Sequence, residues 1–368
     1  GDLIAATQGR GFWVLDDLTP LREMNADVRG EKAHLFPPRP AIRYAYLSSG
    51  NDGDDGPPPA GAGQSPPTGV VFHYFLDKAP AADKADPEVK LEILSGDGKD
   101  GKVLRTFTNK REEKKPEAEP GEGLEAEEGR PVPEPETPES ERLPAEAGLN
   151  RFVWDMTEEA GTRVPGLILW SGTPIAPRAV PGTYTARLTA GGVTRTVPFE
   201  IRKDPLSAAT LDDLRAQHQF LVETQAKLNQ TQDAIRRIRE ARTQIADLRK
   251  RLPEGKDGDA VRDAAKALGQ KLTAVEQALY QTKNRSPQDP LNFPIRLNDK
   301  LNGVAQSAAM GDRRPTRQHI EVRDALVAAI DAELAKLEAV WTTDLAAFND
   351  LARQKGVAAV IPPPSQLK

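Results

Sequence analysis

The spacing of apolar residues changes near residue 205, and this change divides the chain into two parts. Before residue 205, short apolar or alternating runs are separated by glycines and prolines. After it, apolar residues recur every three or four positions, which is typical of amphipathic helices. The first helical stripe consists of Leu214, Leu221, Leu228, Ile235, Ile238, Ile245, Leu248 and Leu252.

The first helix has a clear start. Ser207 or Thr210 can cap it, and acidic residues follow at positions 212 and 213. The stripe predicts a helix of about 40 residues, or about 60 Å at 1.5 Å per residue. The segment LPEGKDGD then interrupts the pattern.

Two further helical stripes follow the interruption, and both have charged flanks. Narrow stripes of this kind predict antiparallel packing, so we expect a long antiparallel helical bundle over residues 205–356, with a tail at 357–368. The stripes consist of Val261, Ala265, Leu268, Leu272, Val275 and Leu279, and of Leu326, Ile330, Leu334, Leu337, Trp341, Leu345 and Phe348.

The first half carries four strand-like segments, at residues 70–77, 89–107, 149–156 and 182–204. The second and fourth contain glycine turns and predict β-hairpins. Short strands without intervening helices predict an immunoglobulin-like antiparallel β-sandwich over residues 37–204, with Trp154 and Tyr184 in its core. The proline-rich stretch at 165–182 predicts an irregular crossing.

Two stretches in this half have compositions that disfavour a packed core. Residues 48–69 are rich in Gly, Pro and Asp, and residues 110–148 are dominated by Glu and Pro. We expect both to be disordered surface insertions. We also expect few contacts to cross the short junction at 204–207, so that the sandwich and the bundle unfold separately.

Charge and composition exclude several classes of function. The net charge of −5 comes from 55 acidic and 50 basic side chains, which gives no basis for binding nucleic acid or an anionic membrane. The chain has no cysteine for a disulfide, a thiolate nucleophile or a Cys-based zinc site. It has no apolar run of 18 residues, so we expect no membrane-spanning segment.

Catalytic and metal chemistry find no support in the residue pattern. His34, His73, His218 and His319 lie in four separate segments without metal-ligand spacing. We therefore assign no catalytic, metal-binding or cofactor-binding residue and expect no cofactor. Carbohydrate binding through Tyr44, Tyr46, Trp154 and Trp170 is a weaker hypothesis, because such aromatic residues usually belong to a core.

The most unusual segment is YQTKNRSPQDPLNFPIRLNDKLNGV, residues 280–304, which has three prolines within eight residues. Its polar side chains can cap helix ends or face a ligand. We interpret the segment mainly as a structural clasp that closes the bundle, with ligand binding as the alternative. The candidate residues are Asn284, Arg285, Gln288, Asp289, Asn292 and Arg296.

Five motifs in order resemble one family. They are GDLIAATQGRGFWVLDDLTPLR at 1–22, LFPPRPAIRY at 35–44, GLNRFVWDM at 148–156, PGTYTARLT at 181–189 and YQTKNRSPQDPLNFPIRLNDKL at 280–301. Together they resemble the C-terminal part of large bacterial proteins described as glycosyl hydrolases with BNR repeats, which are similar to sialidase-like and sortilin-type β-propellers.

The resemblance implies that residues 1–36 form a propeller-closing strand and a connector, and that the rest of the propeller would precede Gly1. The resulting fold class is multidomain β plus α: a terminal propeller strand, an immunoglobulin-like antiparallel β-sandwich and a long antiparallel helical bundle. ATQGRGFW at 6–13 lacks the Asp of an Asp-box, and the sialidase arginine triad has no matching positions.

Two functional hypotheses follow. In the first, the chain is a non-catalytic C-terminal scaffold or interaction module of an exported propeller protein. Its partner is then the propeller, in the same protein or on a separate chain, and the helical bundle is a further surface for a protein partner. In the alternative, the chain is the scaffold of a glycan- or peptide-hydrolysing enzyme whose active site lies in the propeller.

Overall fold

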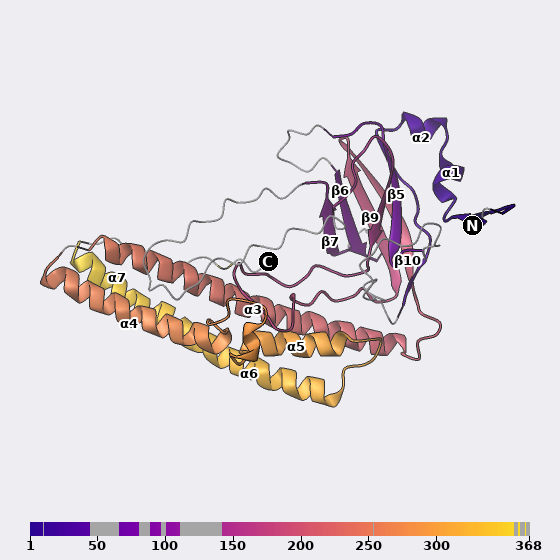
Figure 1. Ribbon diagram of the computed structural model, residues 1–368. Coiled ribbons are helices and arrows are strands. Elements are labelled where there is room, and N and C mark those ends of the chain that lie inside the picture. Colours follow the sequence, from indigo (N-terminus) through magenta and orange to yellow (C-terminus); the bar gives the residue numbers. More distant parts are fainter. Residues whose placement is uncertain are drawn as a thin grey trace.

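The computed structural model describes residues 1–9, 11–44, 66–80, 89–96, 101–110, 142–252 and 254–356, together with 360 and 365. The described part is built from β-sheets followed by α-helices (Figure 1). The expected insertions at 48–69 and 110–148 lie largely outside it, as do Tyr46 and the turn at 97–100. The prediction of a β plus α protein is confirmed at this level.

Within the described residues, eight of the strands form two sheets, and the first two strands along the chain form a third. A five-stranded sheet has the order β4-β10-β9-β6-β7, and a three-stranded sheet has the order β3-β5-β8. All neighbours are antiparallel except β4 and β10, which run parallel. The strands are β3 (Ala33–Leu35), β4 (Ala41–Arg43), β5 (Val70–Leu76), β6 (Val89–Ser95), β7 (Val103–Thr108), β8 (Gly148–Trp154), β9 (Gly182–Ala190) and β10 (Val193–Lys203).

Side chains from both sheets share one hydrophobic core. Strand β5 alternates strictly between buried and half-buried residues, as expected when one face of a sheet is covered. Trp154 is fully buried and Tyr184 is 7 % exposed, and each packs against Phe199. The predicted core positions of Trp154 and Tyr184 and the two predicted hairpins, β6–β7 and β9–β10, are confirmed.

The predicted long helix is α3 (Leu211–Lys250), of 40 residues. The Thr210 hydroxyl caps it by accepting a hydrogen bond from the backbone amide of Asp213, and the Asp213 carboxylate accepts one from the backbone amide of Thr210. This capping box satisfies two backbone donors that have no partner within the helix. Leu214 and Leu228 of its stripe are fully buried.

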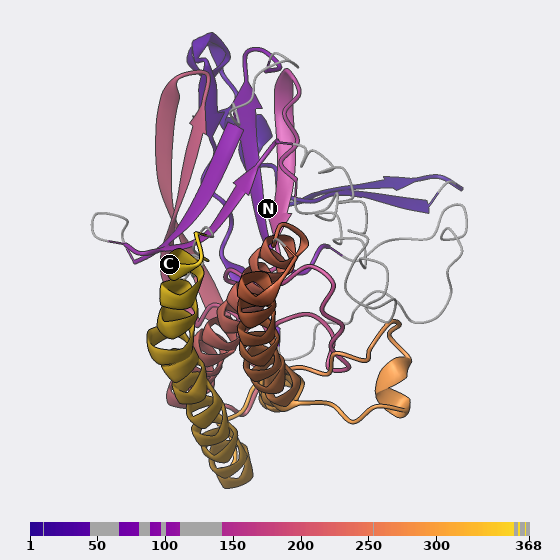
Figure 2. The same ribbon diagram turned by 90° about the vertical axis from the view of Figure 1, so that its left-hand side faces the viewer.

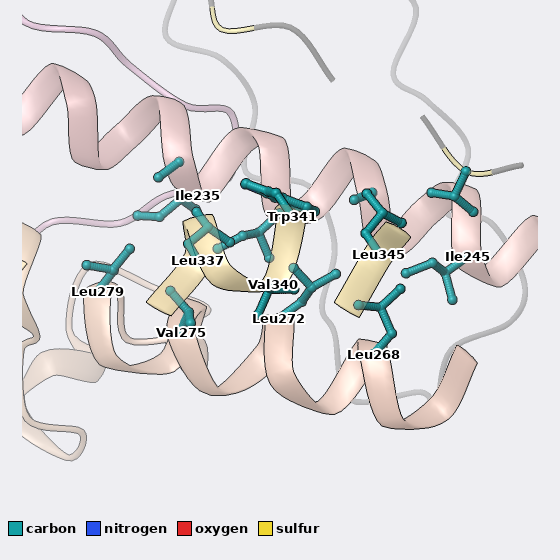
Figure 3. Packing of buried hydrophobic residues seen from close by; sticks show 14 of the residues in the cluster. Ile235, Ile245, Leu268, Leu272, Val275, Leu279, Leu337, Val340, Trp341 and Leu345 are labelled. Atoms are coloured by element: carbon teal, nitrogen blue, oxygen red, sulfur yellow. The ribbon is translucent and has the colours of Figure 1, made fainter. Parts of the chain in front are cut away.

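Helices α4 (Lys256–Leu279) and α6 (Arg317–Ala339) form the remaining predicted stripes. Helix α6 passes through a π-helical turn, Val340–Asp344, into α7 (Leu345–Gln354). Figure 3 shows leucine and valine side chains of α4 packed against the π turn and α3. The last predicted stripe is therefore one nearly continuous helix with an interruption.

A further helix, α5 (Leu297–Ala309), was not predicted. Its buried face includes Asn298, Asp299 and Asn302 beside small alanines. Polar residues therefore occupy positions where a helix stripe is expected to be apolar, which hides the helix from a periodicity argument.

Residues 1–32 contribute no side chain to the three hydrophobic cores. Strands β1 (Leu3–Thr7) and β2 (Gly11–Leu15) pair with each other as an isolated antiparallel hairpin. Short helices α1 (Thr19–Glu23) and α2 (Ala26–Gly30) connect it to β3. The opening segment is thus a two-stranded hairpin instead of the single strand that we expected. The three-stranded sheet already begins at β3, within the expected connector.

Candidate functional site

The β1–β2 hairpin is the most exposed apolar element in the described part of the chain. Figure 2 shows it projecting away from the sheets and helices. All ten of its strand residues are exposed. The exposed fractions are 55 % for Leu3, 65 % for Ile4, 79 % for Phe12, 67 % for Trp13, 58 % for Val14 and 48 % for Leu15.

Both faces of the hairpin are apolar. In the antiparallel register Leu3 lies opposite Leu15, and Ile4 lies opposite Val14. Residues opposite each other point to the same face, and neighbours along a strand point to opposite faces. One face therefore carries Leu3, Ala5, Trp13 and Leu15, and the other carries Ile4, Ala6, Phe12 and Val14. This is the pattern of strands covered on both sides.

Hydrogen bonds hold the base of the hairpin, although the side chains of its two strands are uncovered. The Asp2 carboxylate accepts hydrogen bonds from the backbone of Asp17, at 3.0 Å, and from Arg39, at 2.6 Å. The bond from Asp17 and the Arg39 guanidinium both lower the pKa of Asp2. The Leu18 amide also donates to the carbonyl of Gly1. These bonds join the base of the hairpin to the residues that follow it.

The six clasp candidates do not converge on one point. Asn284 is buried, and its amide donates to the carbonyl of Ile168 at 3.4 Å. Asp289 closes its own turn by accepting bonds from the backbone of Arg285 and Ser286. Arg285, Gln288, Asn292 and Arg296 are exposed. Their positions do not define a binding cavity.

Three other residues of the same segment make the contacts that fasten the chain. Asp299 accepts bonds from the backbone of Trp170 at 2.7 Å and of Ser171 at 3.0 Å. Asn302 accepts from the backbone of Ile175. The Tyr280 hydroxyl accepts from the backbone of Ile168, and burial raises its pKa. Sequence reasoning missed these residues because their partners lie more than 100 positions away.

These bonds fasten residues 165–175 to the bundle. The stretch is irregular, as predicted, and it also packs against bundle cores through Leu167 and Ile175. Gly161 makes a close approach nearby, because a Cβ there would lie 2.9 Å from Pro174. These contacts join the crossing to the helices, whereas the strands of the two sheets and the helices keep separate hydrophobic cores.

A second polar joint lies between β4 and the helices. Arg43 is 3 % exposed and donates to Gln217 of α3 and to Asp312, both at 3.2 Å. Burial and the neighbouring Arg43 charge lower the pKa of Arg178 to about 10. Paired buried charges of this kind fix the relative positions of packed elements, and we assign the cluster a structural role.

Within the ranges that the structure describes, no cluster of three or more histidine, acidic or cysteine side chains has a geometry suited to a metal ion. Two of the histidines have a carboxylate partner: His218 lies 2.6 Å from Glu158, and His34 lies 3.3 Å from Glu31. No helix among these residues is long and apolar enough to cross a membrane. Of the aromatic candidates for carbohydrate binding, Trp154 is buried, whereas Trp170 and Tyr44 are exposed.

Comparisons with known proteins give no family assignment. No family model, no curated protein and no solved structure matches the chain. The functional interpretation therefore depends on the geometry described above, in which an exposed hairpin with two apolar faces is the principal surface feature.

Proposed function

We propose that the chain is a non-catalytic scaffold and interaction module of an exported β-propeller protein, and that it docks through the β1–β2 hairpin. The observation that carries this proposal is the exposure of apolar side chains on both faces of the hairpin. A two-stranded hairpin is marginally stable alone in water, so these residues need a partner that covers them.

A β-propeller suits this requirement. Its blades are small sheets packed against neighbouring blades, so a strand pair added to a blade is covered on two sides. The free edges of β1 and β2 would supply main-chain hydrogen bonds, and the apolar side chains would supply buried area. Full burial of a large apolar side chain is worth about 1.5–3 kcal/mol, so burial of these residues would offset part of the cost of association.

Two further features support the proposal. The motifs of the chain resemble those of propeller-associated bacterial proteins. The strand order β3-β5-β8 and β4-β10-β9-β6-β7 suits an immunoglobulin-like sandwich, a fold that commonly serves as a spacer or recognition domain. In this arrangement the sandwich follows the propeller and the helices extend beyond it.

The test uses the full chain and its Phe12→Ser/Trp13→Ser variant. We expect the wild-type chain to self-associate, because uncovered apolar strands pair readily, and the double variant to be monodisperse. Light scattering after size-exclusion chromatography measures this difference. The matched control is Leu206→Ser, since Leu206 is 92 % exposed but lies outside the hairpin.

A second experiment adds a separately produced propeller polypeptide from the family that this chain resembles. We expect it to form a one-to-one complex with the wild-type chain and no complex with the double variant. The proposal would be overturned if the wild-type chain is monodisperse and does not bind the propeller. If the complex hydrolyses members of a glycan or peptide panel and this chain alone does not, the result would instead favour the alternative hypothesis, in which the chain is the scaffold of a propeller hydrolase.

A further inference from the structure

A groove lies between α3 and α4, away from the hairpin. It has a volume of about 520 Å³ and contains no acidic side chain in its lining. On α4 the lining extends from Ala265 to Gln277, which at 1.5 Å per residue is about 18 Å along the helix. Exposed side chains such as Gln270 and Gln277 border it, so it opens to solvent. Its elongated shape suits an elongated ligand.

The floor of the groove is made of small residues, with Gly269 near its middle. Glycine is disfavoured inside a helix, and a close contact usually explains it. At Gly161 such a contact exists within the chain, whereas a Cβ at Gly269 would meet nothing within 4 Å. The missing side chain leaves room above α4 that no described residue fills.

The borders of the groove are basic. Arg242 lies on α3 and donates to Glu276 at 2.8 Å, which fixes its side chain beside the groove. Arg249 and Lys266 also line the groove, and neither has an acidic partner within the described ranges. A ligand with carboxylates along its edges would complement these charges.

We infer that this groove binds an amphipathic helix of a partner protein, with small residues facing Gly269 and acidic residues beside Arg249 and Lys266. A third helix can lie along the groove of a helix pair, and small floor residues allow close approach. A second copy of the chain using the same groove would oppose cations with cations. The net charge of −5 makes nucleic acid a poor occupant. The inference goes beyond hairpin docking and does not depend on it.

The test measures binding of a fluorescently labelled, designed peptide of about 18 residues, long enough to extend beyond the groove as a helix. The peptide has an alanine- and leucine-bearing face flanked by glutamates. A scrambled peptide of the same composition without the helical period is the control ligand. We expect saturable binding of the designed peptide by fluorescence anisotropy and at least tenfold weaker binding of the scrambled one.

Four variants locate the binding. Gly269→Leu adds a side chain where a Cβ would meet nothing within 4 Å, and it should weaken binding at least tenfold while circular dichroism stays unchanged. Arg249→Glu/Lys266→Glu should weaken it by a similar factor. Lys300→Glu, an exposed change on α5, should have no effect. Gly269→Ala adds a smaller side chain at the same position and provides a second test of the groove floor with less risk of misfolding.

Several outcomes would overturn the inference: no binding of the designed peptide, equal binding of the scrambled peptide, or full binding by Gly269→Leu. Equal binding of both peptides would indicate general electrostatic attraction. The Phe12→Ser/Trp13→Ser hairpin variant should bind the peptide normally. Failure of hairpin docking is therefore distinguishable from failure of the groove.

Discussion

Asp299 shows how one side chain can hold a stretch of irregular backbone. It accepts bonds from two successive amides, those of Trp170 and Ser171, and from the Ser171 hydroxyl. An irregular stretch cannot satisfy its own amides as a helix or sheet does, so it depends on side chains that reach it. Asn302 does the same for Ile175 one helical turn later.

Replacement of Asp299 by alanine should destabilise the protein by about 2 kcal/mol or more, because buried amides lose their acceptor. Urea denaturation measures the loss, and hydrogen exchange should show faster exchange at Trp170 and Ser171. Asp299→Asn retains an acceptor oxygen and should fall between wild type and Asp299→Ala. Unchanged exchange at both amides would contradict the assigned role.

At the scale of elements, a helix or strand could be predicted from the sequence when the residues that stabilise it lie close to it along the chain. Helix α3 was predictable because Thr210 and Asp213 mark its start and its apolar stripe is regular. Helix α5 was not, because Asn298, Asp299 and Asn302 take the inner positions, and Asp299 and Asn302 bond to residues more than 100 positions away. The opening hairpin was half predicted: its apolar residues were evident, but its pairing with itself was not.

The start of α3 should be sensitive to acid. Hydrogen bonds from Thr210 and Arg314 lower the pKa of Asp213 to about 2, below its usual value of 3.8. The stabilising effect of this carboxylate is therefore complete above about pH 4 and is lost as the pH falls from 3.8 towards 2. The stability difference between wild type and Asp213→Asn, measured by thermal unfolding, should shrink over that range. A constant difference would show that the cap does not titrate.

At the scale of the whole molecule, the parts that pack together are not the same as the two parts indicated by the spacing of apolar residues. The sheets have one core, and the helices have others that include Leu167 and Ile175 from the crossing between strands β8 and β9. The stretch at 165–175 therefore belongs physically to the bundle, although it interrupts the sheet half of the sequence. Composition could not reveal this, because the chain leaves the sheets and returns within one proline-rich segment.

Leu228→Asp should consequently unfold the helices and release residues 165–175, while the two sheets remain folded. Leu228 is fully buried, and an unpaired buried carboxylate costs several kcal/mol. Hydrogen exchange read by mass spectrometry should show loss of protection in α3, α5 and the crossing, but not in β5 or β9. Retained protection at 165–175 would place that stretch with the sheets, and loss in every segment would indicate a single cooperative unit.

The length of α3 has a mechanical consequence. The helix is joined to β4 at Gln217 and reaches the basic groove at Arg249, 32 residues further on, or about 48 Å along its axis. A rotation of about 10° at the joint would move the groove by about 8 Å over that length. The hydrogen bonds from Arg43 to Gln217 and Asp312 join β4 to the helical half and oppose such a rotation. If the groove binds a partner as we infer, the length of α3 places that partner about 48 Å along the helix from this joint.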